Sequence, residues 1–184
     1  MQTIVIHNNF NTPPGNNQTF FRGKDHCLFS NVSKENFDEL LSLYPPKERI
    51  IRNCKYSNGE LLAQLVAKDI SYSIANPDYY TTEQLILAIS QMGYLLYGLS
   101  IQDKKYTYLD NHLYKHFLLK MTNLECFYTK LNLRFKKKLL KKNDIFIKMS
   151  INKANYYPKR RQLLGNLSVK IGESFFAEAQ LVTI

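Results

Sequence analysis

The chain has 184 residues, of which 45% are hydrophobic, and this length is typical of one globular domain with a sizeable core. Its three cysteines are widely spaced and form no CxxC pair, which argues against a disulfide framework and against a zinc site. The segment Met1–His7 lacks the charged and apolar parts of a signal peptide, and no apolar run predicts a membrane span, so we expect a cytoplasmic protein.

The net charge of +10 is unevenly distributed. Between Lys130 and Lys170 lysine and arginine are frequent, and the only acid is Asp144. Such a surface attracts phosphates or an acidic protein, so nucleic acid, coenzyme A and an acidic carrier protein are all candidate partners. A solvated strand face is the alternative interpretation.

The first 32 residues read as an N-terminal extension of undefined structure, with a short strand at Thr3–His7 followed by loop residues. The domain is expected to cover residues 33–184. It begins with a helix from Ser33, as N-cap, to Tyr44, which Pro45-Pro46 ends.

A hairpin and a long helix follow. Asn58-Gly59 joins the predicted strands Arg49–Tyr56 and Glu60–Ile70, and this dipeptide is the strongest short-range hairpin signal. The helix covers Tyr79–Tyr97 and is apolar on nearly all sides, which predicts that it is buried.

The start of this helix carries several capping signals. Thr81 and Gln84 fit a capping box, and Tyr80 can pack on Leu85 as a hydrophobic staple. Glu83 suits the positive end of the helix dipole.

The remaining chain predicts an antiparallel sheet. Ile101–Met121 is ambiguous, a helix or a loop holding His112 and His116, which we interpret as surface or structural histidines rather than metal ligands. Beyond it, apolar residues alternate with polar ones, as in strands with one buried face, along Phe127–Phe135, Ile145–Ile151, Leu167–Ile171 and Ala177–Leu181. A helix, a hairpin, a long apolar helix and four strands predict an α+β protein with the hot-dog fold, a curved antiparallel sheet wrapped around a central helix, in preference to a generic α+β sandwich.

Several familiar catalytic motifs are absent, namely GxSxG, the Walker loop, GxGxxG and HExxH. The remaining chemistry lies on the long helix, whose leading amides can stabilise an oxyanion. Glu83 is the only carboxylate there and is either a general base or a surface acid that complements the dipole. Thr81 is a cap that can also point into a site, and Ser90 either acts on substrate or bonds back to the preceding turn. Tyr44 is by default a half-buried core aromatic.

Three stretches resemble the FcoT-like long-chain acyl-CoA thioesterases in order and spacing. The aliphatic run Leu85–Tyr94 is similar to the central helix of that family, in which such a run precedes Asn-Gln-Leu-Ala-Tyr. Leu40–Tyr44 followed by Tyr56-Ser57 resembles its first helix and next strand, and Phe127–Lys137 resembles its strand ending in Arg-Phe-Arg-Lys. Together these stretches cover most of Leu40–Ile184.

The resemblance implies a hot-dog fold and hydrolysis of fatty acyl thioesters by a site of tyrosines and asparagines, without a catalytic carboxylate, metal or separate cofactor. The two tyrosines fall on Tyr44 and Tyr72, with Tyr79 or Tyr80 possible for the second. The two helix asparagines fall on Thr81 and Ser90, which keep a single hydroxyl donor in place of an amide. Gln91 and Tyr94 keep the identity found in the family, and the basic flank expected near coenzyme A phosphates falls on Arg134, Lys136, Lys137 and Lys138.

Our first hypothesis is an acyl-thioesterase that acts on fatty acyl-CoA or on an acyl-carrier protein, so that coenzyme A or phosphopantetheine enters only as part of the substrate. The helix amides and Thr81 hold the thioester oxygen, and Tyr44, Tyr72 and Ser90 position water and substrate. Tyr80, Glu83, Gln91, Tyr94, Arg134 and Lys136 complete the substrate-binding set, and a channel beside Leu87, Met92 and Leu96 takes the acyl chain. We expect at least a dimer, with the site at its interface.

Three alternatives remain. A non-catalytic acyl-thioester or lipid-binding protein is favoured by the changes at Thr81 and Ser90. A dehydratase or other tailoring enzyme lacks support because no strand histidine pairs with a helix carboxylate. A nucleic-acid binder is the weakest, since no recognisable reading motif is present, and we expect no nucleic-acid partner.

Overall fold

The computed structural model describes residues 3–5, 29–67, 77–103, 111–123, 125–141, 144–160, 162–173 and 175–183. Predicted features on other residues, Tyr72 among them, lie outside these ranges. The elements in chain order are β1 (Thr3–Val5), β2 (Ser30–Asn31), α1 (Lys34–Leu40), a 3₁₀ turn (Pro46–Glu48), β3 (Ile51–Ser57), β4 (Glu60–Leu65), α2 (Thr82–Gln102), α3 (Asn111–Thr122), β5 (Cys126–Phe135), β6 (Phe146–Tyr157), a 3₁₀ turn (Pro158–Arg160), β7 (Gln162–Ile171) and β8 (Phe175–Thr183).

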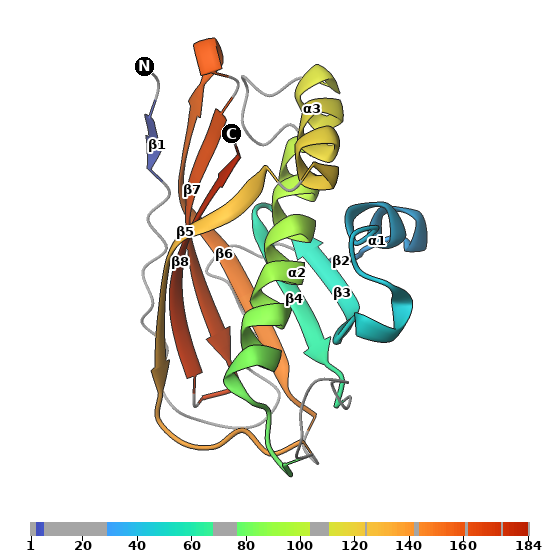
Figure 1. The fold of residues 1–184 in the computed structure, drawn as a ribbon, viewed down its shortest axis with the longest axis vertical. Coiled ribbons are helices and arrows are strands. Elements are labelled where there is room, and N and C mark those ends of the chain that lie inside the picture. Colours follow the sequence, from blue (N-terminus) through green and yellow to red (C-terminus); the bar gives the residue numbers. More distant parts are fainter. Residues whose placement is uncertain are drawn as a thin grey trace.

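One curved antiparallel sheet runs alongside the long helix α2 (Figure 1). Seven of its strands follow the order β2-β3-β4-β6-β7-β8-β5. The short strand β1 lies outside this order and pairs with β6. The pairing of β4 with β6 joins the hairpin that precedes α2 to the strands that follow it, with Leu61 opposite Met149. The predicted arrangement, a curved sheet around a central helix, is therefore confirmed, and parts of the predicted extension, β1 and β2, belong to the same sheet.

The central helix is buried because its apolar residues face the sheet on one side and α1 and α3 on the others. Leu85, Ile89, Met92 and Leu96 are fully buried and join the core with the inward-facing residues of the strands. By length and composition α2 could cross a membrane, contrary to our expectation that no run would qualify, but 78% of its most apolar window is buried inside the molecule. This burial is typical of the core helix of a globular domain.

Several boundaries differ from the predicted ones. Ser33 is the N-cap of α1 as predicted, accepting the amide of Asn36 at 3.2 Å, but α1 ends at Leu40 and a turn carries the chain to Tyr44. The helix α2 continues to Gln102, beyond the predicted end at Tyr97. The ambiguous segment forms a helix at its C-terminal part, α3.

The hairpin turn is the predicted one. Asn58 and Gly59 both have positive φ, 45° and 77°, which the tight turn between two twisted strands requires. Before this turn, strand β3 has a bulge between Arg52 and Lys55, where Asn53 has a φ of 51°.

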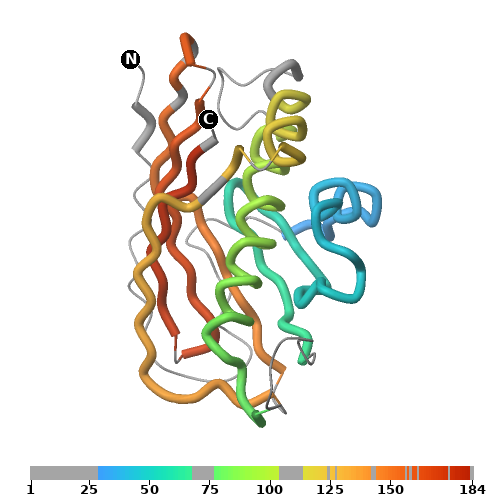
Figure 2. The backbone as a smooth tube through the Cα atoms, viewed as in Figure 1, coloured from blue at the N-terminus to red at the C-terminus, as the bar shows by residue number. Residues whose placement is uncertain are grey.

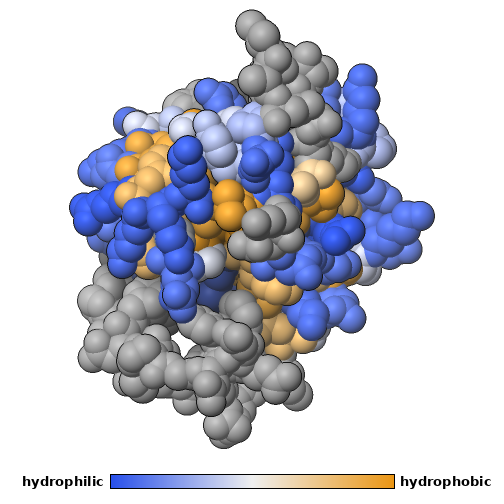
Figure 3. Space-filling model, turned by 90° about the horizontal axis from the view of Figure 1, so that it is seen from below, coloured by the Kyte–Doolittle hydropathy of each residue, from blue (hydrophilic) through white to orange (hydrophobic). Residues whose placement is uncertain are grey.

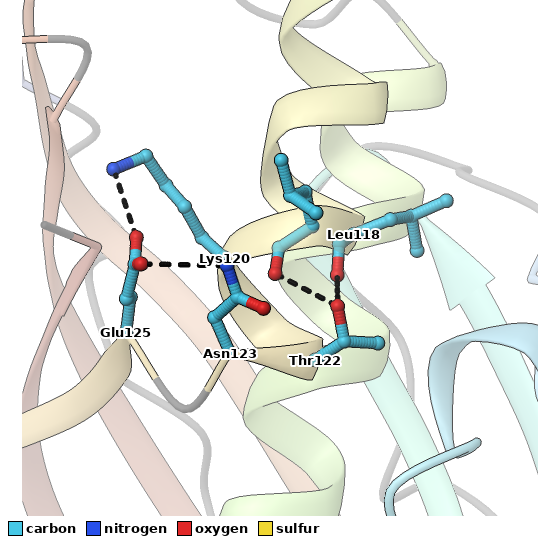
Figure 4. Close-up of polar contacts among 6 residues, drawn as sticks. Leu118, Lys120, Thr122, Asn123 and Glu125 are labelled. Atoms are coloured by element: carbon cyan, nitrogen blue, oxygen red, sulfur yellow. Dashed lines mark hydrogen bonds and ion pairs between the residues drawn. The ribbon is translucent and has the colours of Figure 1, made fainter.

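The end of α3 fixes the start of β5 (Figure 4). The Thr122 hydroxyl donates to the carbonyls of Leu118 and Leu119 at 3.1 and 2.8 Å, and Lys120 pairs with Glu125 at 3.6 Å. Because Glu125 directly precedes Cys126, these contacts fix the point at which the chain leaves α3 and enters β5.

Candidate functional site

The first turn of α2 is capped as predicted. The amide of Gln84 donates to the Thr81 hydroxyl at 3.4 Å, and the amide of Thr81 donates to the Gln84 side chain at 2.9 Å. Glu83 is exposed, and a hydrogen bond from its own amide, aided by the Thr81 hydroxyl, lowers its pKa. The amides of Glu83 and Gln84 are therefore engaged within the turn, and Glu83 fits the description of a surface acid that complements the dipole.

Tyr80 enters the core just before the cap. Its side chain is 4% exposed, and its hydroxyl has no hydrogen-bond partner within the described part of the chain. Burial raises the pKa of this phenol. Its amide donates to the Leu139 carbonyl at 2.8 Å, which fastens the start of α2 to the segment that links β5 and β6.

Tyr44 and Ser90 meet at the middle of α2. Tyr44 lies in the turn after α1 and is half-buried, as is Ser90 on the helix. The Ser90 hydroxyl faces the Tyr44 phenol: burial raises the pKa of Tyr44 to about 12, and hydrogen bonding by Ser90 lowers it in part. The phenol is therefore neutral at ordinary pH and acts as a donor rather than a base.

Two further tyrosines surround this pair. The Tyr94 ring lies 6.0 Å from the Tyr44 ring at 51°, and its hydroxyl donates to the Cys126 carbonyl at 3.2 Å. The Tyr128 hydroxyl donates to the Ile89 carbonyl at 2.8 Å. Burial raises the pKa of both phenols, so both stay protonated and hold β5 against α2.

Tyr128 was not predicted as part of the site. It reaches the backbone of α2 because Gly93 leaves room, since a Cβ there would lie 2.3 Å from the Tyr128 hydroxyl. A glycine inside an apolar helix indicates such a close approach, and this is the signal that could have revealed it.

Gln91 binds backbone groups of the chain before β3. Its side-chain carbonyl accepts the amide of Ile50 at 3.0 Å, and its side-chain NH₂ donates to the Glu48 carbonyl at 3.0 Å. It is fully buried and links the chain before β3 to the helix. The structure thus gives this predicted substrate-binding residue a backbone-holding role.

The other predicted residues lie apart from the Tyr44–Ser90 pair. Arg134 and Lys136 are exposed at the end of β5, and the Lys136 ammonium lies 5.1 Å from the Phe176 ring centroid. Thr81 precedes Ser90 by nine residues, about 14 Å along the helix axis, so one thioester carbonyl cannot contact both. The described residues contain no cluster of histidine, cysteine or acidic side chains that could hold a metal.

One stripe of α2 is not covered by the sheet. It contains Glu83, Ile86, Leu87 and Ser90, spaced as neighbours on one helix face, and each is exposed or half-buried. Met92 and Leu96, predicted to line an acyl channel with Leu87, are instead fully buried in the packed core. The half-buried β5 residues Leu131 and Leu133 also face the helix side. Figure 3, seen from the end where α2 begins, shows apolar surface among hydrophilic side chains.

Comparisons with known proteins support the fold alone. No protein-family profile and no curated protein matches the sequence. A protein of Shewanella oneidensis assigned as a thioesterase superposes with a TM-score of 0.52 and 11% identity, over 83% of this chain and 99% of that chain.

Two other solved structures are less similar. A mutant thioesterase of Pseudomonas aeruginosa gives a TM-score of 0.47 at 12% identity, over 84% of this chain and 96% of that chain. A sigma28-regulated virulence protein of Campylobacter jejuni gives 0.47 at 7% identity, over 83% and 93%. With its antiparallel sheet around a long central helix and its superposition on the Shewanella oneidensis structure, this chain has the α+β hot-dog fold.

Proposed function

We propose that this protein is an acyl-thioesterase in which Ser90 and Tyr44 contact the thioester. The observation that carries the proposal is the position of Ser90, half-buried on a stripe of the central helix that the sheet leaves uncovered, beside the half-buried Tyr44 phenol from the turn after α1. The resemblance to the FcoT-like family, and the thioesterases among structures of the same fold, support the same reaction.

The two hydroxyls act by stabilising charge. Both are neutral donors, and a donor placed where the thioester oxygen gains charge lowers the barrier to attack by water. The water oxygen bonds to the carbonyl carbon, the C–S bond breaks, and the water proton passes to solvent or to the departing thiolate. A thiol pKa near 8.5 makes this leaving group good enough to depart without a dedicated acid.

The surroundings of the pair suit a fatty acyl group. Ile86 and Leu87 lie on the same face of α2 as Ser90 and supply apolar surface there, and the half-buried Leu131 and Leu133 on β5 pack against the core. Glu83 lies at the start of the same helix face, Thr81 caps the helix just before it, and Tyr80 is buried beneath the cap. Tyr72 is a further candidate outside the described residues. Arg134 and Lys136 supply positive charge for a phosphate of the substrate, which we take to be a cytoplasmic acyl-CoA or acyl-carrier protein.

A thiol-release assay tests the reaction. Ser90→Ala and Tyr44→Phe should each lower kcat/KM for a long-chain acyl-CoA at least about tenfold, since one lost transition-state hydrogen bond is worth that much or more. The chain offers matched controls on the same helix, because Tyr56 donates to Ser100 at 3.3 Å in a second tyrosine–serine pair. Ser100→Ala and Tyr56→Phe, checked for folding by circular dichroism, should leave the rate within about twofold. No release above background at any chain length would refute the proposal.

A non-catalytic acyl-thioester binder is the second candidate. It is favoured because Tyr44 stays protonated and because Glu83, the carboxylate on α2 nearest Ser90 along the helix, lies seven residues away, about 10 Å along the axis. Tight binding of acyl-CoA without release of thiol would select this function.

We further propose that two copies pair along β5. Within the described chain β5 is the last strand of the sheet and pairs only with β8, so its other edge is available for pairing with a second copy. Light scattering should give about twice 21.6 kDa. Leu131→Lys should shift the mass to the monomer, whereas Leu119→Lys, at an exposed position on α3, should not. A wild-type monomer at high concentration would contradict this assembly.

A further inference from the structure

A basic segment crosses the end of the molecule beneath the start of α2 (Figure 2). We call Lys136–Lys141, which leaves the end of β5, the basic strap. Its backbone is fastened to the residues before α2, because Tyr79 and Leu140 form a β-bridge and the amide of Lys141 donates to the Asp78 carbonyl at 2.7 Å. Leu139 is buried, while Lys136, Lys137 and Lys138 are exposed. The strap therefore holds its lysines in place at the positive end of the helix dipole.

The positive surface continues onto the outer face of the sheet. In register, Arg134 lies opposite Phe176, Phe176 opposite Lys170, and Lys170 opposite Lys148. Directly opposed residues share a face, so these four form one row, the cationic row, across four strands and about 14 Å. Phe146, two residues before Lys148 on the same face, is 41% exposed.

Acidic residues reduce this charge only in part. Lys148 pairs with Glu60 at 3.0 Å, and Glu178 lies in the next row, opposite Asn132 and Ser168. Arg134 and the strap lysines 136, 137 and 138 are exposed at the other end of the row. The most positive part of the surface is thus the part closest to the start of α2.

The width of this surface favours a protein partner over a nucleotide. The phosphates of coenzyme A gather at one end of a small molecule, whereas these cations extend along a strap and across four strands. Base stacking of single-stranded nucleic acid needs open aromatic faces. The Phe176 ring has the Lys136 and Lys170 ammoniums 5.1 and 6.0 Å from its centroid, which leaves Phe146 as the exposed aromatic residue of this face in the described part of the chain, too few rings to stack successive bases. The partner that best complements this extended positive surface is a folded protein whose acidic residues are spread over one face.

The distance from the strap to Ser90 matches a phosphopantetheine arm. The strap lies under the first turn of α2, and Ser90 is nine residues beyond Thr81, about 14 Å along the axis. The arm has 13 bonds from sulfur to phosphorus, similar to about four extended residues, or roughly 15 Å. The stripe Glu83–Ile86–Leu87–Ser90 runs along this path and is not buried.

We infer that the basic strap and the cationic row dock an acidic acyl-carrier protein, whose phosphopantetheine arm runs along the exposed stripe of α2 and brings its thioester to Ser90 and Tyr44. The inference rests on the proposed thioesterase function and names its carrier. The carrier phosphate lies at the strap, and the charged face of the carrier covers the row.

Binding of a fluorescently labelled, acidic acyl-carrier protein in its holo form tests the inference. The double variant Arg134→Glu/Lys137→Glu should weaken its affinity at least about tenfold, because like charges would then face each other. Lys115→Glu, at an exposed position on α3, introduces the same change away from the surface and should alter the affinity by less than about twofold. The wild-type affinity should also fall as ionic strength rises.

Three results would overturn the inference: no binding of the carrier protein, equal binding by the double variant, or a loss confined to coenzyme A or to a single-stranded oligonucleotide. Thiol release by the wild type from an acyl-pantetheine thioester, which has neither carrier nor nucleotide, tests the proposed function separately. Hydrolysis without carrier binding would refute only the docking. Charge-dependent carrier binding without thiol release from any substrate would refute only the hydrolysis.

Discussion

Two tyrosine–serine pairs along α2 differ in what surrounds them. Tyr56 donates to Ser100 and Asp103, both at 3.3 Å, and accepts the amide of Gly59 at 3.1 Å, and Ser100 is 1% exposed. That pair fixes the hairpin to the end of the helix. Ser90, which lies beside Tyr44, is instead on the uncovered stripe of α2, so the same two residue types can meet a substrate there.

The close approach of the Tyr128 hydroxyl to α2 at Gly93 can be tested by two substitutions. Gly93→Ala should destabilise the protein by about 1–3 kcal/mol, because the new methyl group would overlap the Tyr128 hydroxyl. In a Tyr128→Phe background the next ring atom lies 3.4 Å away, so the same change should be neutral or stabilising, given that alanine favours a helix by about 1 kcal/mol over glycine. Urea unfolding of the four proteins measures this coupling. Equal effects of Gly93→Ala in both backgrounds would show that the tyrosine does not approach the helix as described.

At the scale of elements, the capping box decides where α2 begins. The residues Thr81 and Gln84 satisfy each other's amides, and the sequence alone identified this start correctly because capping depends on neighbours in the chain. The end of α2 was placed five residues too early. Its last turn, up to Gln102, is buried against other elements, and periodicity does not reveal such packing.

Removing the cap should cost stability. Thr81→Ala should lower the free energy of unfolding by about 0.5–2 kcal/mol, whereas Thr82→Ala, at the exposed first helical position, should change it by less than about 0.5 kcal/mol. Urea denaturation measures both. If Thr81→Ala stays fully stable but loses thiol release, Thr81 acts on the substrate, as the family resemblance implies.

At the scale of the whole molecule, buried phenols make stability depend on alkaline pH. Burial raises the pKa of both Tyr44 and Tyr56 to about 12, and the pKa values of Tyr94 and Tyr128 are also raised. Unfolded tyrosine has a pKa near 10, so these groups favour the folded state below that pH, and their contribution is lost as pH rises toward 12.

The urea midpoint should therefore fall between about pH 8 and about pH 11, by less in a Tyr44→Phe/Tyr56→Phe variant, because phenylalanine does not ionise. Glu83→Gln is a control, since its carboxyl is exposed and titrates in the acid range. A midpoint that is the same at both pH values would mean that the phenols are accessible to water in the folded state.

Sequence patterns were sufficient to predict the hairpin with its tight turn at Asn58-Gly59, the cap at Thr81, the burial of the central helix and the strands that follow it. Each of these depends on residues close together in the chain or on a repeating apolar pattern. Which polar groups meet depends instead on how distant elements pack together. This packing places Tyr44 beside Ser90, turns Gln91 toward the backbone at Glu48 and Ile50, and brings Tyr128 onto Gly93. These contacts join residues that are 35 to 46 positions apart in the chain. No local sequence pattern specifies which side of a buried helix a distant strand or turn will contact.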